Sequence, residues 1–250
     1  MPPVTRTAKF AVYFKGLDRK VLEGKEGLWY QLARSQGEIT RAANQVLSAL
    51  YLVKTGALSH PLKEGKLVPM KTLAWAPFRQ KDPWVPFGDP VYTPGRAALA
   101  AGNLTELAGL IYTRLEEDFK DIRKGKQTLP TFRTVPLPIR ADCIKITRDK
   151  DDLQIAVSLW AGRGQPRVML SPVLGRREHA QRDILERVAS GVYKHGSAKM
   201  YKDDRSKKWM LSLSWTGNVA EVEGDRVAGV DLGLITTATV AYTTTAGEEA

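Results

Sequence analysis

The stretch KWMLSLSW, residues 208–215, places an apolar residue at every second position from Trp209 to Trp215. This alternation predicts a β-strand with one face in a hydrophobic core, and it assigns both tryptophans to that face. The preceding stretch, 179–202, has apolar residues at helical spacing up to Gly191 and then changes to strand alternation. One helix and two strands are therefore expected across this region.

Alternation of the same kind predicts further strands at 142–148, 153–160 and 166–171, and one isolated strand at 4–15. A single strand is not stable alone, so the first strand must join the later ones in one sheet or barrel. The long segment between them is then an insertion into a β domain.

The inserted segment is predicted to be mainly helical. Apolar residues recur at three- and four-residue steps over 28–53, which predicts a long amphipathic helix that is broken or weakened near Gly37. A second helix is expected from Asn103, acting as its N-cap, to Gly125. The prolines of 59–95 exclude a continuous helix there and predict a loop with short helical pieces. The apolar stripes predict that the two long helices pack on each other.

Composition adds a strong charge signal. The chain has 38 Lys and Arg against 27 Asp and Glu, a formal net charge of +11 and a sequence pI near 9.7. This excess favours a nucleic-acid partner, although a solvated basic surface has the same composition. No apolar run is long enough for a membrane span and no signal peptide is evident, so a cytoplasmic protein without membrane contact is expected. The single Cys143 excludes a disulfide framework or a thiolate zinc site, and we expect it to be a small core residue.

The stretch GVDLGLITTATVA, residues 229–241, carries one acid in an apolar strand and should form a hairpin with the strand that follows. Ribonuclease-H-like nucleases use such a strand aspartate to bind catalytic metal ions, and actin-like ATPases use a similar turn to bind phosphate. An aspartate that caps a turn is the third interpretation. The ATPases place this loop at the start of their fold, so its late position here favours the nuclease.

Four stretches together resemble the miniature type V-F CRISPR effector nucleases and, more distantly, the transposon-encoded TnpB proteins. They are QTLPTFRTVPLPIR (127–140), RDILERVASGVYKHGSAKMYKDDRSKKWMLSLSW (182–215), VAGVDLGLITTATVAY (227–242) and, more weakly, ITRAANQVLSALY (39–51). These stretches occur in the same order as in the family, and they are spread along most of the chain.

The resemblance implies an α+β protein with three parts. An OB-like β-barrel, or wedge, domain would comprise 1–20 and 130–217, a helical recognition domain would comprise 21–129, and an RNase H-like RuvC domain would begin within 225–250. The implied activity is RNA-guided DNA cleavage, with guide RNA and target double-stranded DNA as partners. Two copies on one guide are also implied, although the apolar helix stripes equally suit an ordinary core.

The resemblance makes Asp231 the first RuvC carboxylate, catalytic and a ligand of Mg²⁺. The stretches that supply the other carboxylates lie outside this sequence, and Glu248 and Glu249 are expected to be solvated, so the chain is expected to be the front half of a nuclease. Some relatives bind zinc in the helical part, which this chain is not expected to do. The alternative function is a programmable nucleic-acid binder that does not cleave, and an actin-like ATPase is the third.

Basic side chains are the remaining candidates, as phosphate contacts or as solvated charges. Around one strand-to-helix turn lie Arg163, Arg167, Arg176 and Arg177, and flanking the last hairpin of the β domain lie Lys194, Lys199, Lys202, Arg205, Lys207 and Lys208. In the helical segment, Arg34, Arg41 and Lys54 lie off the apolar stripe and are candidates for contact with duplex DNA near the protospacer-adjacent motif. Trp160 fits either of two roles, as a core residue or as a surface on which bases stack.

Overall fold

The structure is a computed structural model, and it describes residues 3–15, 27–78, 98–149, 152–160, 167–174, 179–218, 228–231 and 239–242. The chain divides into two compact units, Thr5–Gly217 and a smaller one formed by Met1–Val4 with Asn218–Ala250. The larger unit is α+β and is described first.

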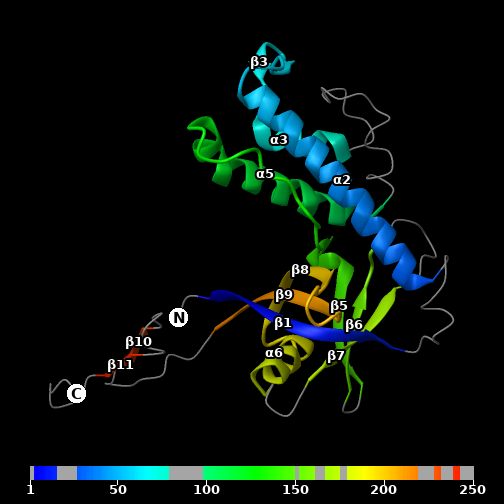
Figure 1. Cartoon of the computed structure of the whole chain (residues 1–250). Helices are drawn as coiled ribbons and strands as arrows, with labels where there is room; N and C mark the ends of the chain where they lie inside the picture. The colour runs from blue at the N-terminus through cyan, green and yellow to red at the C-terminus, as the bar shows by residue number, and fades with distance from the viewer. Residues whose placement is uncertain are drawn as a thin grey trace. The chain divides into compact units, whose positions relative to one another are not determined.

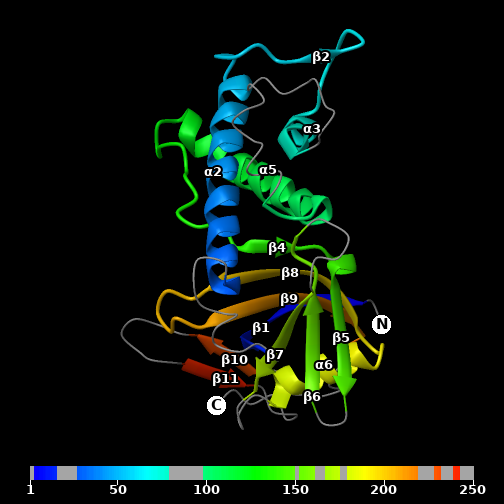
Figure 2. The same ribbon diagram turned by 90° about the vertical axis from the view of Figure 1, so that its right-hand side faces the viewer.

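A seven-stranded sheet curls into a nearly closed barrel in the larger unit (Figures 1 and 2). Its strands are β1 (Val4–Phe14), β4 (Leu137–Ile139), β5 (Ile144–Asp149), β6 (Asp152–Val157), β7 (Val168–Val173), β8 (Lys194–Lys202) and β9 (Trp209–Gly217). Their order is β4-β8-β9-β1-β7-β6-β5. Strand β1 pairs antiparallel with β7, from Ala11 opposite Val173 to Phe14 opposite Leu170. The prediction that the first strand joins the later ones is confirmed.

The core of the sheet lies on the face that the alternation of β9 predicted. Trp209 and Trp215 are 9% and 5% exposed, and Leu211 and Leu213 between them are fully buried. The Trp209 ring packs edge to face on Phe14 of β1, with the ring centres 6.1 Å apart. Burial of each large apolar side chain stabilises the fold by about 1.5–3 kcal/mol, so this face contributes strongly to folding. The assignment of both tryptophans to the core is confirmed.

The described parts of the segment between β1 and β4 contain helices and one small hairpin. They are α2 (Leu28–Lys54), α3 (Met70–Trp75), the 3₁₀ turn η1 (Ala76–Phe78), α5 (Ala101–Arg123) and the hairpin of β2 (Leu62–Lys63) with β3 (Lys66–Leu67). As predicted, α2 and α5 pack on each other, and Tyr51 meets Phe119 edge to face at 6.2 Å. Figure 2 shows their crossing, and both helices contact β4.

Helix α2 runs without a break through Gly37, so the predicted possibility of a break there is wrong. Ser35 and Ile39, on either side of the glycine, are both buried. A glycine in a helix interior costs about 1 kcal/mol, and the packing of these neighbours offsets that cost.

The predicted N-cap role of Asn103 is also wrong. Helix α5 begins at Ala101, which places Asn103 inside its first turn, fully buried. The Asn103 amide donates hydrogen bonds to the carbonyl oxygens of Ser158 (3.0 Å) and Leu159 (3.1 Å), and its oxygen accepts one from the Arg140 backbone N–H (2.9 Å). Asn103 therefore joins α5 to the segments that follow β6 and β4.

Two details around residue 140 differ from expectation. The short strand β4 was missed, because it has three residues and contains Pro138, which argues against a strand interior. It pairs at the end of the sheet with β8, where a missing N–H is tolerated. Cys143 lies in the 3₁₀ turn η3 (Ala141–Cys143) before β5 and is only half-buried, so it is not a core residue. Burial, with a smaller effect of Asp142, raises the pKa of its thiol.

The remaining elements are one helix and one hairpin. Helix α6 (His179–Ala189) lies between β7 and β8 along the chain and contacts β5, and Gly191 follows it at φ 80°, as its predicted stop requires. In the smaller unit, β10 (Ala228–Asp231) pairs antiparallel with β11 (Thr239–Tyr242), which confirms the predicted hairpin. Among the helices that the structure describes, none is long and apolar enough to span a membrane.

Candidate nucleic-acid interface

The β8–β9 hairpin has a turn that is fixed by its own hydrogen bonds. The Asp203 backbone N–H donates to the Lys208 carbonyl, and the Lys207 N–H donates to the Asp203 carbonyl, both at 2.8 Å. The Asp203 carboxylate also accepts a bond from the Ser206 backbone N–H at 2.7 Å. Hydrogen bonds from Ser206 lower the pKa of Asp203 below its ordinary value. Lys207 adopts the left-handed conformation, with φ 58°, so the turn presents its side chains in one arrangement.

All six cations predicted on this hairpin are exposed, namely Lys194, Lys199, Lys202, Arg205, Lys207 and Lys208. They do not share one face. Lys202 lies opposite Trp209 in the register and so shares its face, whereas Lys199 lies opposite Ser212 on the other face. Two acidic residues, Asp203 and Asp204, lie between Lys202 and Arg205 in the sequence of the turn. The positive charge of the hairpin is therefore distributed over two surfaces.

Each of these two surfaces borders a pocket. The first, the helix–sheet pocket of about 480 Å³, lies between α5, β4 and β8, and Lys199 lines it together with Lys71, Glu106, Tyr112, Thr113 and Pro138. The second, the hairpin pocket of about 210 Å³, lies between α2 and the turn of β8–β9, and is lined by Trp29, Ala33, Gln36, Lys202, Lys207 and Trp209. The sequence did not reveal either pocket, because their walls come from distant parts of the chain.

The three predicted cations of α2 have different surroundings. Arg34 pairs with Glu38 at 2.9 Å, and this bond raises the pKa of the arginine. Arg41 is exposed. Lys54 forms an ion pair with Glu116 of α5, and its ammonium lies 4.3 Å from the centre of the Phe119 ring. Lys54 therefore holds α2 against α5, in addition to any contact with DNA.

The arginine cluster predicted around the strand-to-helix turn lies mostly outside the described residues. Arg167 is exposed directly before β7. Arg163, Arg176 and Arg177 are not among the residues that the structure describes. Trp160 donates a hydrogen bond to the Ser35 hydroxyl at 3.0 Å, which joins the end of β6 to α2 and favours a structural role.

Two of the stretches that carry the family resemblance contact each other. The Asn44 side chain of α2 donates to the Phe132 carbonyl (3.0 Å) and accepts from its backbone N–H (2.7 Å). One turn earlier, the Thr40 hydroxyl accepts from the Val135 N–H at 3.0 Å. The helix thus positions the segment that leads into β4 and into the sheet. The sequence contained both stretches but gave no sign of this pairing.

The predicted metal site is described only in its backbone. Asp231 ends β10 and lies opposite Thr239, and its side chain is outside the described residues. Among the residues whose side chains are described, no group of three or more His, Cys, Asp and Glu is arranged to hold a metal ion. One carboxylate is too small a donor set for the pair of metal ions of such nucleases, so Asp231 alone does not fit Mg²⁺.

Comparison with known proteins supports the likeness seen in the sequence. No protein-family model matches the chain. The CRISPR-associated endodeoxyribonuclease Cas12f1 of Sulfoacidibacillus thermotolerans is 24% identical over 151 residues, which are 58% of this chain and 36% of that protein. The resemblance to the miniature type V-F CRISPR effectors is confirmed.

Solved structures of Cas12f proteins have the same fold. A cryo-EM structure of a Cas12f1–sgRNA–target DNA complex matches 99% of this chain and 65% of its own, with a TM-score of 0.54 and 15% identity. A CRISPR–Cas12f ternary complex matches 91% of this chain and 50% of its own, with a TM-score of 0.52 and 14% identity. The chain thus spans half to two thirds of these Cas12f chains.

Proposed function

We propose that this chain is the guide-RNA- and target-DNA-binding N-terminal part of an RNA-guided DNA endonuclease of CRISPR type V. The observation that carries the proposal is the β8–β9 hairpin, which has exposed cations along β8 and on a turn fixed by backbone hydrogen bonds. The net charge of +11 and the likeness to Cas12f proteins support it.

The domain arrangement is part of the same proposal. We assign the curled sheet of 1–20 and 130–217 to an OB-like wedge domain and the helices of 21–129 to a recognition insertion, with a RuvC domain beginning within 225–250. The pairing of β1 with β7 supports the split wedge, because the helices lie between these strands in the chain. The contact of α2 and α5 with β4 supports a fixed junction between the two parts.

The physical basis of binding is electrostatic. Each lysine or arginine that neutralises a phosphate releases condensed counterions, so affinity falls with salt by about 0.7 log units per log unit of salt and per contact for a single strand, and by about 0.9 for a duplex. A fixed turn also loses little conformational entropy when it binds. The hairpin should therefore bind phosphates of the nucleic-acid backbone with little preference for sequence.

Substitution of Lys199, Lys202, Lys207 and Lys208 with alanine tests this assignment. The log–log salt slope for RNA binding should fall by up to about three, the sum for four lost phosphate contacts. A control variant replaces four exposed cations at the end of α5, Lys120, Arg123, Lys124 and Lys126, and changes the charge equally. An unchanged slope in the hairpin variant, or equal losses in both variants, would contradict a specific role of the hairpin.

We also propose that Asp231 is the first carboxylate of a RuvC metal site, completed by residues that lie outside this sequence. Support comes from the strand position of Asp231 and from the Cas12f likeness. Asp231 and the completing residues would together hold the metal ions, and the completed site would supply activation of water and stabilisation of charge on the phosphate.

In a full-length protein, Asp231→Ala should abolish DNA cleavage and leave guide and target binding nearly unchanged. Glu248→Ala is the matched control, since this carboxylate is expected to be solvated, and it should keep cleavage. Cleavage that persists in the Asp231 variant would show that the aspartate caps a turn. Binding without cleavage in the unaltered full-length protein would instead favour the programmable binder.

A further inference from the structure

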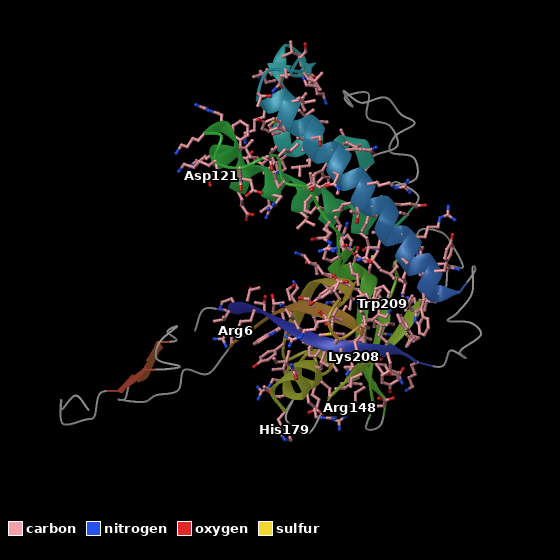
Figure 3. The ribbon with its side chains drawn as sticks, in the orientation of Figure 1. Arg6, Asp121, Arg148, His179, Lys208 and Trp209 are labelled. Atoms are coloured by element: carbon pink, nitrogen blue, oxygen red, sulfur yellow. The ribbon has the colours of Figure 1, made fainter. Side chains whose placement is uncertain are left out.

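The hairpin pocket combines two aromatic side chains from distant parts of the chain. Trp29 belongs to the first turn of α2 and is 40% exposed, whereas Trp209 begins β9 and is 9% exposed. Figures 1 and 2 both show the start of α2 close to the sheet, and Trp209 and Lys208 are labelled in Figure 3. An exposed tryptophan beside basic side chains is typical of surfaces on which nucleobases stack.

Two residues of the pocket wall, Trp209 and Gln36, are fixed before any ligand arrives. The Trp209 ring is held by its edge-to-face contact with Phe14 and by its place in the β8–β9 register. The Gln36 amide nitrogen donates to the Val135 carbonyl at 3.1 Å, which sets the direction of that side chain. A prearranged wall lowers the entropy that a ligand must lose on binding.

Positive charge lies on the sheet side of the same pocket. Lys202 and Lys207 line it, and both are exposed. The backbone of Lys207 is held by its bond to Asp203 and by its left-handed conformation. The pocket thus offers aromatic surface for a flat ring and ammonium groups for an anion attached to that ring.

The size of the pocket narrows the class of ligand. Its volume of about 210 Å³ is below the roughly 300–1,000 Å³ that drug-sized ligands occupy, so one ring system suits it. A nucleobase with its neighbouring phosphates unites a flat ring and negative charge. We propose that the hairpin pocket binds one unstacked nucleobase of a single strand, with Trp29 and Trp209 against the base and Lys202 and Lys207 at the adjoining phosphates. This inference rests on the proposed nucleic-acid binding and adds recognition of a base to it.

The test compares probes that share a backbone and differ in their bases. A dye-labelled oligoadenylate RNA, an abasic oligonucleotide of equal length and an oligodeoxyadenylate are titrated with the chain at low salt, with anisotropy as the readout. The unaltered chain should bind the oligoadenylate about 5- to 150-fold more tightly than the abasic probe, the gain from one stacked base. Trp29→Ala should remove that preference and Trp29→Phe should restore part of it. Tyr30→Ala should keep it, since Tyr30 is also an exposed aromatic residue on the same helix but lies outside the pocket wall.

The results separate the two proposals. Equal, salt-dependent affinity for oligoadenylate and abasic probes would overturn the base pocket and leave phosphate binding standing. A preference that survives Trp29→Ala would place the stacking elsewhere and would also overturn it. Failure of every probe to bind would contradict both proposals. Tighter binding of the RNA than of the DNA probe would identify the base as one of a guide strand, and the reverse would identify a displaced DNA strand.

Discussion

Replacing Asn103 with alanine should lower the free energy of unfolding of the larger unit far more than removal of an amide side chain from the surface would. The three hydrogen bonds of this fully buried side chain would be lost. The Leu159 carbonyl keeps a second donor, the Ala100 N–H at 2.8 Å, so the Ser158 carbonyl and the Arg140 N–H are the groups left unpaired. An unsatisfied buried group costs about 1–3 kcal/mol, and these two are partly buried, so we expect a loss of about 2–4 kcal/mol.

Urea and thermal unfolding measure this loss. For a chain of this size, the midpoint temperature should fall by on the order of 10 °C. Asn44→Ala is the matched control, because its amide also donates and accepts backbone hydrogen bonds, both with Phe132, but is only half-buried, and it should cost about 1 kcal/mol. A loss below about 1 kcal/mol for Asn103→Ala, or one no larger than that of the control, would refute the claim that Asn103 joins α5 to the sheet.

Three further results are expected. The pKa of Asp203 is lowered in the folded state, so its bond to Ser206 stabilises the turn fully above the ordinary pKa of about 3.9. This stabilisation is lost as pH falls through the lowered pKa. The free energy of unfolding, measured against pH, should show this loss in the unaltered chain and not in Asp203→Asn. The raised pKa of Cys143 should keep its thiolate fraction at pH 7 below the roughly 3% of an ordinary thiol, so alkylation should be slower than that of a free cysteine peptide. Gly217→Ala should cost about 1–3 kcal/mol in urea unfolding, since a Cβ there would lie 2.2 Å from the Tyr193 ring; a neutral result would mean that the ring moves freely.

Much of the sheet was predictable because its signal is local. Alternation alone placed β8 and β9 and assigned Trp209 and Trp215 to the core, and the solitary first strand required later partners. The long helices followed from their apolar stripes in the same way. Each of these inferences uses the spacing of apolar residues, which can be read directly from the sequence, or the instability of a strand without a partner.

Features that depend on distant partners were not predictable. Asn103 has the local signature of an N-cap, but its partners Arg140 and Ser158 lie 37 and 55 residues away. Strand β4 exists because β8 offers it an edge, which three residues with a proline do not reveal. The hairpin pocket unites Trp29 with Trp209, and no spacing rule connects the two. The domain boundaries and the role of Asp231 stay predictions.

The pairing of β1 with β7 also delays the folding of β1 while the chain is being synthesised. Ala11 meets Val173, so the first strand is made long before its neighbour on that side. At about 5–20 residues per second, the ribosome needs on the order of ten seconds to span this interval. Throughout that time Phe10, Val12 and Phe14, which are buried in the folded protein, have no neighbouring strand to pack against. A nascent chain of this design should therefore depend on chaperones that shield β1, and a slowed ribosome should lower its yield more than that of a protein whose strands pair in sequence.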